Sequence, residues 1–179
     1  TNNLGLLSGH STNSTSTADL TLTGDRFTYT NPAQITTSGN VVIESSSTSF
    51  STTYTTGGAP IAGGPASVRI GKSTNDSNVT VSADITAAGP ITIYGTDLTL
   101  NDGIDLISTA SSTIGLYALN DFITAGTTRR VLQTSNGDIN LYADAELAWT
   151  NQDTAVRIFK HMWNGMIKAS EHGQKRVHP

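Results

Sequence analysis

One short pattern recurs along the chain at nearly constant intervals. Two aliphatic residues flank an outward position, a second outward residue follows, and a small or short polar residue closes the group, as in Ile91-Thr92-Ile93-Tyr94-Gly95. Copies begin at residues 20, 41, 68, 91, 114 and 139, so they are 21, 27, 23, 23 and 25 residues apart. A repeat of about 20 to 50 residues is typical of a solenoid.

Each unit contains up to three short apolar runs with the period-two alternation of strands. The fourth unit is the clearest, with Ile91/Ile93, Leu98/Leu100 and Ile104/Leu106, and the fifth continues with Phe122 or Ile123 and then Val131. Glycine, asparagine, aspartate and proline punctuate the runs, as turns require. One coil cannot bury its own aliphatic side chains, so coils must stack. The pattern predicts an all-β parallel β-helix of about six three-faced coils over residues 19–146.

The two ends of the chain differ from the repeats. Residues 1–18 are polar and predict an irregular lead-in or cap. Residues 147–179 carry a formal charge of +3, against −7 for residues 1–146. The helical spacing of their apolar residues predicts an amphipathic helix. It could close the open end of the coil, form an association surface, or belong to a junction foreign to the repeats. Its apolar residues are Val156, Phe159, Trp163, Met166 and Ile167.

Composition excludes several classes of function. Only 13% of residues are charged and the net charge is −4, so nucleic acid is not an expected partner. No apolar stretch approaches the roughly 18 residues that cross a membrane, so we expect no membrane insertion. Without cysteine the chain has no disulfides or thiolate metal sites, which fits a protein outside the cell. Since it begins at Thr1, we expect a mature product or an excised fragment.

The chain shows little that is typical of an enzyme. It has no phosphate-binding glycine loop, metalloprotease helix or nucleophile elbow. A carbohydrate-active β-helix would need carboxylates gathered on one face. Most of the candidate aspartates adjoin glycine, asparagine or a strand end, where this residue serves in turns. We therefore expect no catalysis, no cofactor and no bound metal. The candidates are Asp84, Asp97, Asp102, Asp105 and Asp121.

Two rows of outward positions are candidate binding surfaces. In the first strand of successive units, Tyr94, Tyr117 and Tyr142 occupy the same position and predict an aromatic column. The column could simply stabilise neighbouring coils, or it could receive a sugar or a partner protein. On the second strand, a row of short hydroxyl side chains could order water as in ice-binding solenoids. That row is Thr28, Ser51, Thr80 and Thr99.

Residues 85–146 resemble the repeats of filamentous-haemagglutinin-type bacterial adhesins. The resemblance rests on Gly89-Pro-Ile-Thr-Ile, Ser112-Thr-Ile-Gly-Leu and Asn136-Gly-Asp-Ile-Asn-Leu-Tyr-Ala. It implies a right-handed parallel β-helix, export through the outer membrane, and attachment to cells or surfaces. We therefore expect a non-enzymatic, secreted or cell-surface bacterial solenoid, a piece of an adhesin or fibrous scaffold whose partner is a host-cell or environmental surface, including its glycans. Self-association would use the carboxyl-terminal helix. A carbohydrate-active β-helix enzyme is the alternative, and an ice-binding solenoid is the third.

Overall fold

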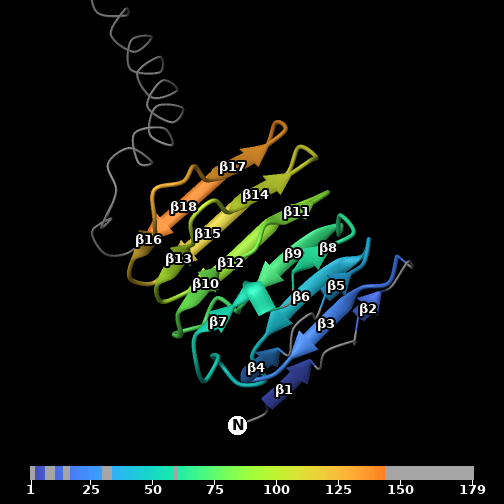
Figure 1. Cartoon of the computed structure of the whole chain (residues 1–179), viewed down its shortest axis with the longest axis vertical. Helices are drawn as coiled ribbons and strands as arrows, with labels where there is room; N and C mark the ends of the chain where they lie inside the picture. The colour runs from blue at the N-terminus through green and yellow to red at the C-terminus, as the bar shows by residue number, and fades with distance from the viewer. Residues whose placement is uncertain (1–2, 7–10, 14–16, 30–33, 59, 144–179) are drawn as a thin grey trace, which may run out of the picture.

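The chain is a parallel β-solenoid of about five turns (Figure 1). The computed structural model describes residues 3–6, 11–13, 17–29, 34–58 and 60–143. Every strand pairing among these residues is parallel, and each pairing joins a strand to the corresponding strand of a neighbouring turn. The backbone hydrogen bonds therefore run along the axis of the coil.

The first face is one continuous sheet of six strands, to which every turn contributes. Its central strands are nearly invariant in length because the aliphatic alternation in them is uninterrupted. In spatial order from the amino-terminal end, the strands are β3 (Leu20–Thr23), β6 (Asn40–Glu44), β9 (Ser67–Ile70), β12 (Ile91–Gly95), β15 (Ile114–Ala118) and β18 (Ile139–Ala143).

The second and third faces are each divided into two sheets. The second face comprises β1 (Asn3–Leu6) with β4 (Arg26–Tyr29), then β7 (Tyr54–Thr55), β10 (Val79–Val81), β13 (Leu98–Leu100) and β16 (Phe122–Thr124). A 3₁₀ turn, η1 (Thr56–Gly58), follows β7. The third face comprises β2 (Ser11–Asn13), β5 (Gln34–Thr36) and β8 (Ile61–Ala62), then β11 (Ile85–Ala87), β14 (Asp105–Ser108) and β17 (Val131–Thr134).

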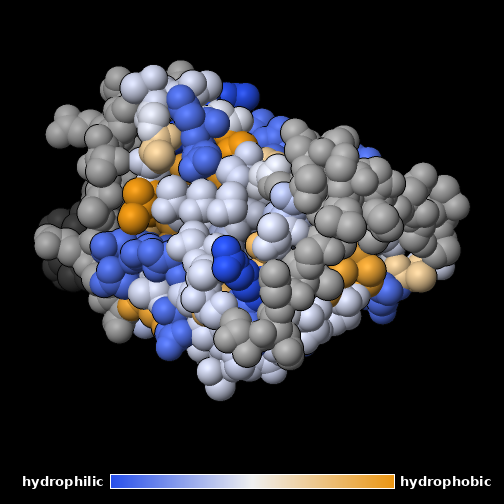
Figure 2. All heavy atoms as spheres, turned by 60° about the horizontal axis from the view of Figure 1, so that its bottom comes forward, coloured by the Kyte–Doolittle hydropathy of each residue, from blue (hydrophilic) through white to orange (hydrophobic). Residues whose placement is uncertain are grey.

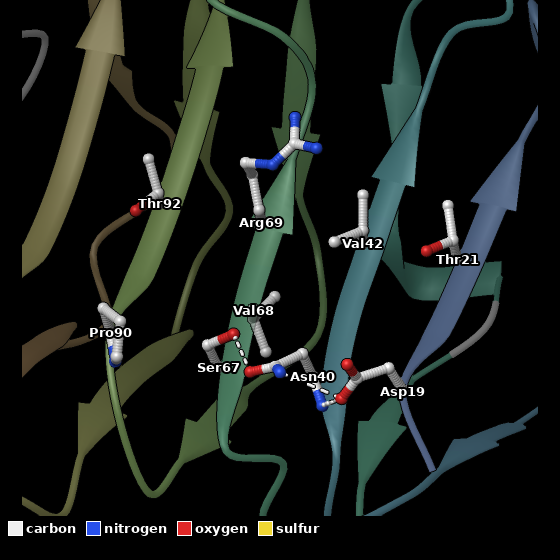
Figure 3. A pocket seen from close by; sticks show the side chains of 9 residues that line it. All are labelled: Asp19, Thr21, Asn40, Val42, Ser67, Val68, Arg69, Pro90 and Thr92. Carbon is white, nitrogen blue, oxygen red and sulfur yellow. Dashed lines mark hydrogen bonds between the residues drawn. The ribbon is translucent and has the colours of Figure 1, made fainter.

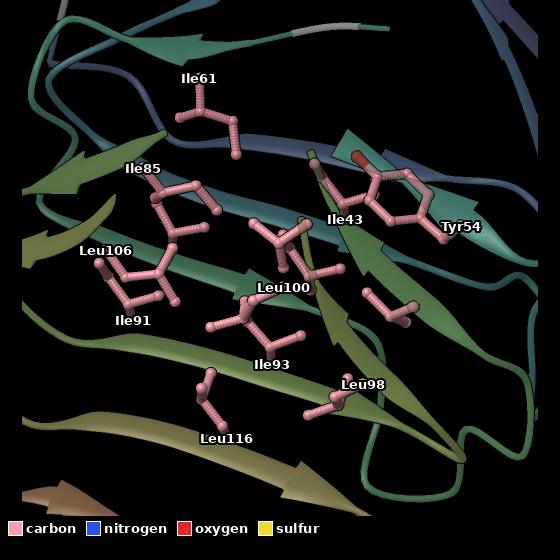
Figure 4. Close-up of a cluster of buried hydrophobic side chains, with 14 of the residues drawn as sticks. Ile43, Tyr54, Ile61, Ile85, Ile91, Ile93, Leu98, Leu100, Leu106 and Leu116 are labelled. Atoms are coloured by element: carbon pink, nitrogen blue, oxygen red, sulfur yellow. The ribbon is translucent and has the colours of Figure 1, made fainter. Parts of the chain in front are cut away.

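The register on the first face is the one that the repeat predicts. Ile91 pairs with Ile114, and Ile114 pairs with Ile139. Ile91, Ile93 and Ile114 are fully buried, and Figure 4 shows such side chains converging inside the coil. Burying one of them is worth roughly 1.5–3 kcal/mol, so stacking is what stabilises each turn.

Glycines at one corner let successive turns approach closely. Gly39 and Gly89 lie just before first-face strands, and a Cβ at either would overlap the carbonyl oxygen of Ala18 or Ala66 in the preceding turn. Gly137 stands in the same relation to Ser112. These positions need a residue without a side chain, which explains why glycine recurs there.

Several expectations about the interior need correction. The core residue of the fifth unit on the third face is Leu132 rather than Val131, since Leu132 pairs with buried Leu106 and packs on the core. Tyr54 is a buried core residue that alternation did not single out. A second-face strand of only two residues, such as β7, cannot be located from alternation alone where serine and threonine surround it.

The ends of the coil also differ from expectation. The lead-in is not wholly irregular, because β1 and β2 pair in register with β4 and β5. The coil has about five turns rather than six, with β18 opening a further one. The right-handed sense of the coil stays a prediction. Residues 147–179, with the predicted amphipathic helix and its Val156, Phe159, Trp163, Met166 and Ile167, lie outside the described residues.

The face of the coil at its amino-terminal end is mostly polar or neutral where it is coloured in Figure 2. Figure 2 brings the amino-terminal end of the coil forward and shows hydrophobic residues only as small separate patches among its coloured atoms. A binding surface in the described part of the chain must therefore be sought in particular rows of side chains.

Candidate binding face

The outer side of the first-face sheet carries two rows of side chains that cross its strands. Strand register places Tyr94, Tyr117 and Tyr142 opposite one another in β12, β15 and β18. Two residues earlier in each strand, a second row reads Thr21, Val42, Arg69, Thr92, Gly115 and Asn140. Neighbouring strands are about 4.8 Å apart, so both rows follow the axis of the coil.

The first two rings of the tyrosine row pack against each other. The rings of Tyr94 and Tyr117 are stacked, with centroids 5.1 Å apart and an interplanar angle of 18°. A Cβ on Gly115 would lie 2.7 Å from Cε2 of Tyr117, so the Tyr117 ring lies over the backbone of its own strand. Tyr142 is 57% exposed. The predicted column is thus a set of rings on the outer face, and its use in binding stays a prediction.

The row begins at Tyr94 because the preceding turn has glycine at this position. Gly71 has a φ of +79°, a conformation that side-chain-bearing residues rarely adopt. Its carbonyl accepts a hydrogen bond from Nη1 of Arg69 at 2.9 Å, and Nη2 of Arg69 pairs with Oε2 of Glu44 at 2.8 Å. The guanidinium is therefore bound both to its own turn and to the preceding one.

A shallow groove of about 410 Å³ lies on the same sheet, on the amino-terminal side of the tyrosines (Figure 3). One rim is a chain of polar groups from three successive turns. Asn40 donates to Oδ1 of Asp19 from both its backbone amide at 2.8 Å and its Nδ2 at 2.9 Å, and Ser67 Oγ donates to Oδ1 of Asn40 at 2.6 Å. The groove is also lined by Thr21, Val42, Val68, Arg69, Pro90 and Thr92.

Sequence reasoning missed this groove. The usable signal was the residue just before each first aliphatic residue, which reads Asp19, Asn40 and Ser67 in the first three units. These short polar side chains are the right length to bridge strands that lie about 4.8 Å apart. Within a single unit, each of these three residues is typical of a turn, so one unit alone does not indicate a groove.

The threonine row on the second face is only partly assembled. Thr80 and Thr99 are in register, but the preceding partner is Thr55 rather than Ser51, and the row continues to Ile123. Thr28 lies in β4, which pairs with β1 instead. The corrected row has three threonines, and ice binding stays an untested prediction.

The carboxylates of the candidate aspartates accept hydrogen bonds from neighbouring turns of the coil. Oδ1 of Asp84 accepts the backbone amide of Asp105 at 2.9 Å, and Oδ1 of Asp105 accepts that of Val131 at 3.0 Å. Asp97 and Asp121 share one donor, because Nδ2 of Asn120 donates to Oδ1 of Asp97 at 2.9 Å and to Oδ2 of Asp121 at 3.2 Å.

Asp102 belongs to a corner clamp with Thr128 and Arg130. Its carboxylate accepts hydrogen bonds from the backbone amide and hydroxyl of Thr128, and Nη2 of Arg130 lies 3.5 Å from Oδ1. Desolvation is the largest single influence on Asp102 and opposes its ionisation, but the hydrogen bonds from Thr128 and Thr127 and the charge of Arg130 together outweigh it and lower the pKa of Asp102. The buried Arg130 also donates from Nε to the carbonyls of Leu100 and Asn101.

Two other features are absent from the described residues. No three histidine, aspartate or glutamate side chains there gather closely enough to hold a metal ion. Within the same ranges, no helix combines the length and apolar character needed to cross a bilayer.

Comparison with known proteins gives no relative. No protein-family model, curated protein or solved structure matches this chain. The class that the structure defines is therefore the parallel β-solenoid, without a family assignment.

Proposed function

We propose that this solenoid is a non-enzymatic binding module of a secreted or surface-displayed bacterial protein, a piece of an adhesin or fibrous scaffold. Its binding face would be the outer side of the first-face sheet. It would bind cells, glycans or environmental surfaces. The proposal needs no cofactor.

The observation that carries the proposal is the register of Tyr94, Tyr117 and Tyr142 on the outside of the coil. Aromatic rings bury much apolar area when a partner covers them, while the tyrosine hydroxyl keeps a polar handle. Tyr142 leaves 57% of its surface to solvent, and the stacked rings of Tyr94 and Tyr117 precede it in the same row. The resemblance of residues 85–146 to adhesin repeats supports the same function.

The test compares surface binding by the wild type and a Tyr94→Ala/Tyr117→Ala/Tyr142→Ala variant. Binding to immobilised cells and to a glycan array should fall by about tenfold or more in this variant, because most of the apolar contact is removed. The matched control is Thr55→Ala/Thr80→Ala/Thr99→Ala, which truncates three outward residues in register on the second face.

Unchanged binding by the tyrosine variant, together with a lower melting temperature, would contradict the proposal. It would show that the rings only stabilise neighbouring turns, where an aromatic pair is worth about 0.5–1.5 kcal/mol.

A further inference from the structure

The groove beside the tyrosines has the parts of a small saccharide site. One rim is the Asp19–Asn40–Ser67 chain, which offers a carboxylate, an amide and a hydroxyl. Both hydrogen bonds from Asn40 go to Oδ1 of Asp19, so Oδ2 can accept from a ligand hydroxyl. The floor includes the short side chains of Val42 and Thr92. A volume of about 410 Å³ is within the range of small-ligand pockets.

The groove and the tyrosines form one surface. Thr92 lines the groove and Tyr94 starts the tyrosine row, two residues later on the same side of β12. That spacing is about 7 Å along a strand. The next ring, Tyr117, follows 5.1 Å from Tyr94 in the adjacent turn. A chain of linked sugars leaving the groove would therefore meet the tyrosine rings.

We infer that the groove binds a neutral saccharide and that the attached glycan continues along the coil axis over Tyr94 and Tyr117. This inference rests on the proposed function and adds a subsite and a ligand class to it. The groove supplies hydrogen bonds to hydroxyl groups, and the rings supply apolar contact for the sugar faces.

The charges of the groove favour a neutral ligand over an acidic one. Asp19 places a carboxylate at the rim, and the guanidinium of Arg69 is already paired with Glu44 at 2.8 Å. Residues 1–146 carry a formal charge of −7. Among the residues that line the groove, a sialylated, sulfated or uronic glycan would meet the carboxylate of Asp19 and no unpaired cation, and like charges at such distances repel. Sugar hydroxyls have no such conflict.

The test uses a pair of substitutions at outward, half-buried threonines. Thr92→Glu places a larger, charged side chain in the groove, beside Arg69, its register partner in the adjacent strand. The new side chain should obstruct the saccharide. Thr99→Glu makes the same chemical change on the second face, away from the groove. Because both positions face outward, both variants should melt close to the wild type.

The measurement is binding of the whole chain to an array of neutral, sialylated, sulfated and uronic glycans, followed by titration calorimetry with the best glycan. We expect neutral glycans to bind, with affinity about tenfold lower or worse for Thr92→Glu and nearly unchanged for Thr99→Glu. Equal affinity of the two variants would overturn the groove assignment, and a preference for acidic glycans would overturn the neutral ligand. Either result leaves the proposed function standing if the tyrosine variant still loses binding. Binding of cells but of no glycan would overturn the inference alone.

Discussion

The interior of the coil is filled in two different ways. In the middle turns, aliphatic side chains such as Ile91, Leu98 and Leu106 stack on similar residues in adjacent turns. Near the amino-terminal end, four aromatic rings share the interior, with centroid distances of 5.2 to 6.4 Å in stacked and edge-on arrangements. These rings are Phe27, Tyr29, Phe50 and Tyr54, called the aromatic section below.

The comparison shows how a solenoid tolerates irregular repeats. The spacing from Val41 to Val68 is 27 residues, the longest of the series, yet Val41 and Val68 remain paired on the first face. The extra residues lie between the first and second faces, because residues 45–53 separate β6 from β7 whereas only residues 96–97 separate β12 from β13. Register on the first face is thus maintained while the connection to the second face lengthens.

The aromatic section also places polar groups inside the coil. Oη of Tyr29 donates to Oη of Tyr54 at 3.0 Å, and Tyr54 is only 3% exposed. The middle turns contain aliphatic side chains at the equivalent inward positions. The two sections should therefore respond differently to substitution and to pH.

The largest expected effect is a charge inside the aliphatic section. Ile93→Asp removes a fully buried side chain and places a carboxylate among apolar neighbours. We expect the free energy of unfolding to fall by about 4 kcal/mol or more. Thr92→Asp, one residue earlier and facing outward, should change it by less than about 1 kcal/mol. Urea melts measure both, and similar losses would contradict the assignment of inward and outward positions.

A smaller and asymmetric effect is expected in the aromatic section. Tyr29→Phe removes the only hydrogen bond described for the buried Tyr54 hydroxyl and should cost about 1–3 kcal/mol. Tyr54→Phe leaves the hydroxyl of Tyr29, which is only half-buried and can reach water, so it should cost about 1 kcal/mol. Thermal or urea melts would order the two variants, and the reverse order would contradict this account.

The same pair predicts sensitivity to alkali. Burial, partly offset by the hydrogen bond to Tyr54, raises the pKa of Tyr29 to about 12. Burial also raises the pKa of Tyr54, and the nearby Tyr29 adds to the shift. Since the folded values exceed the ordinary 10.0, this contribution to stability is complete below pH 10 and declines as the pH rises toward 12. A Tyr29→Phe/Tyr54→Phe variant should lose that decline in urea melts.

The smallest effect concerns acid and the corner clamp. The lowered pKa of Asp102 means that its contribution is present above the ordinary pKa of 3.8 and is lost as the pH falls through the lower folded value. Asp102→Asn should therefore flatten the acid side of the stability curve slightly. Asp76→Asn is the control, because its carboxylate makes none of the hydrogen bonds described in the structure. Identical curves for the two variants would contradict a role for the clamp.

Much of the fold could be predicted from residues on the first face. The uninterrupted alternation at Ile91/Ile93 and Ile114/Leu116 specifies which side chains point inward, and the near-constant interval specifies which ones stack. The tyrosine row follows from the same reasoning, because Tyr94 and Tyr117 occupy equivalent places in equivalent strands. The groove could not be predicted in this way, since Asp19, Asn40 and Ser67 differ chemically and meet only through the register.

The sequence by itself determined the first-face strands, their parallel stacking and the outward tyrosines, because a period-two pattern repeated at a nearly constant interval leaves a single way to bury the aliphatic side chains. Tertiary structure alone decided which residues meet where the pattern is interrupted. It selected Thr55 over Ser51, Leu132 over Val131, and the burial of Tyr54 and Arg130. The physical reason is that corner lengths vary, and the hydrogen bonds between turns, rather than the count of residues, set the register there.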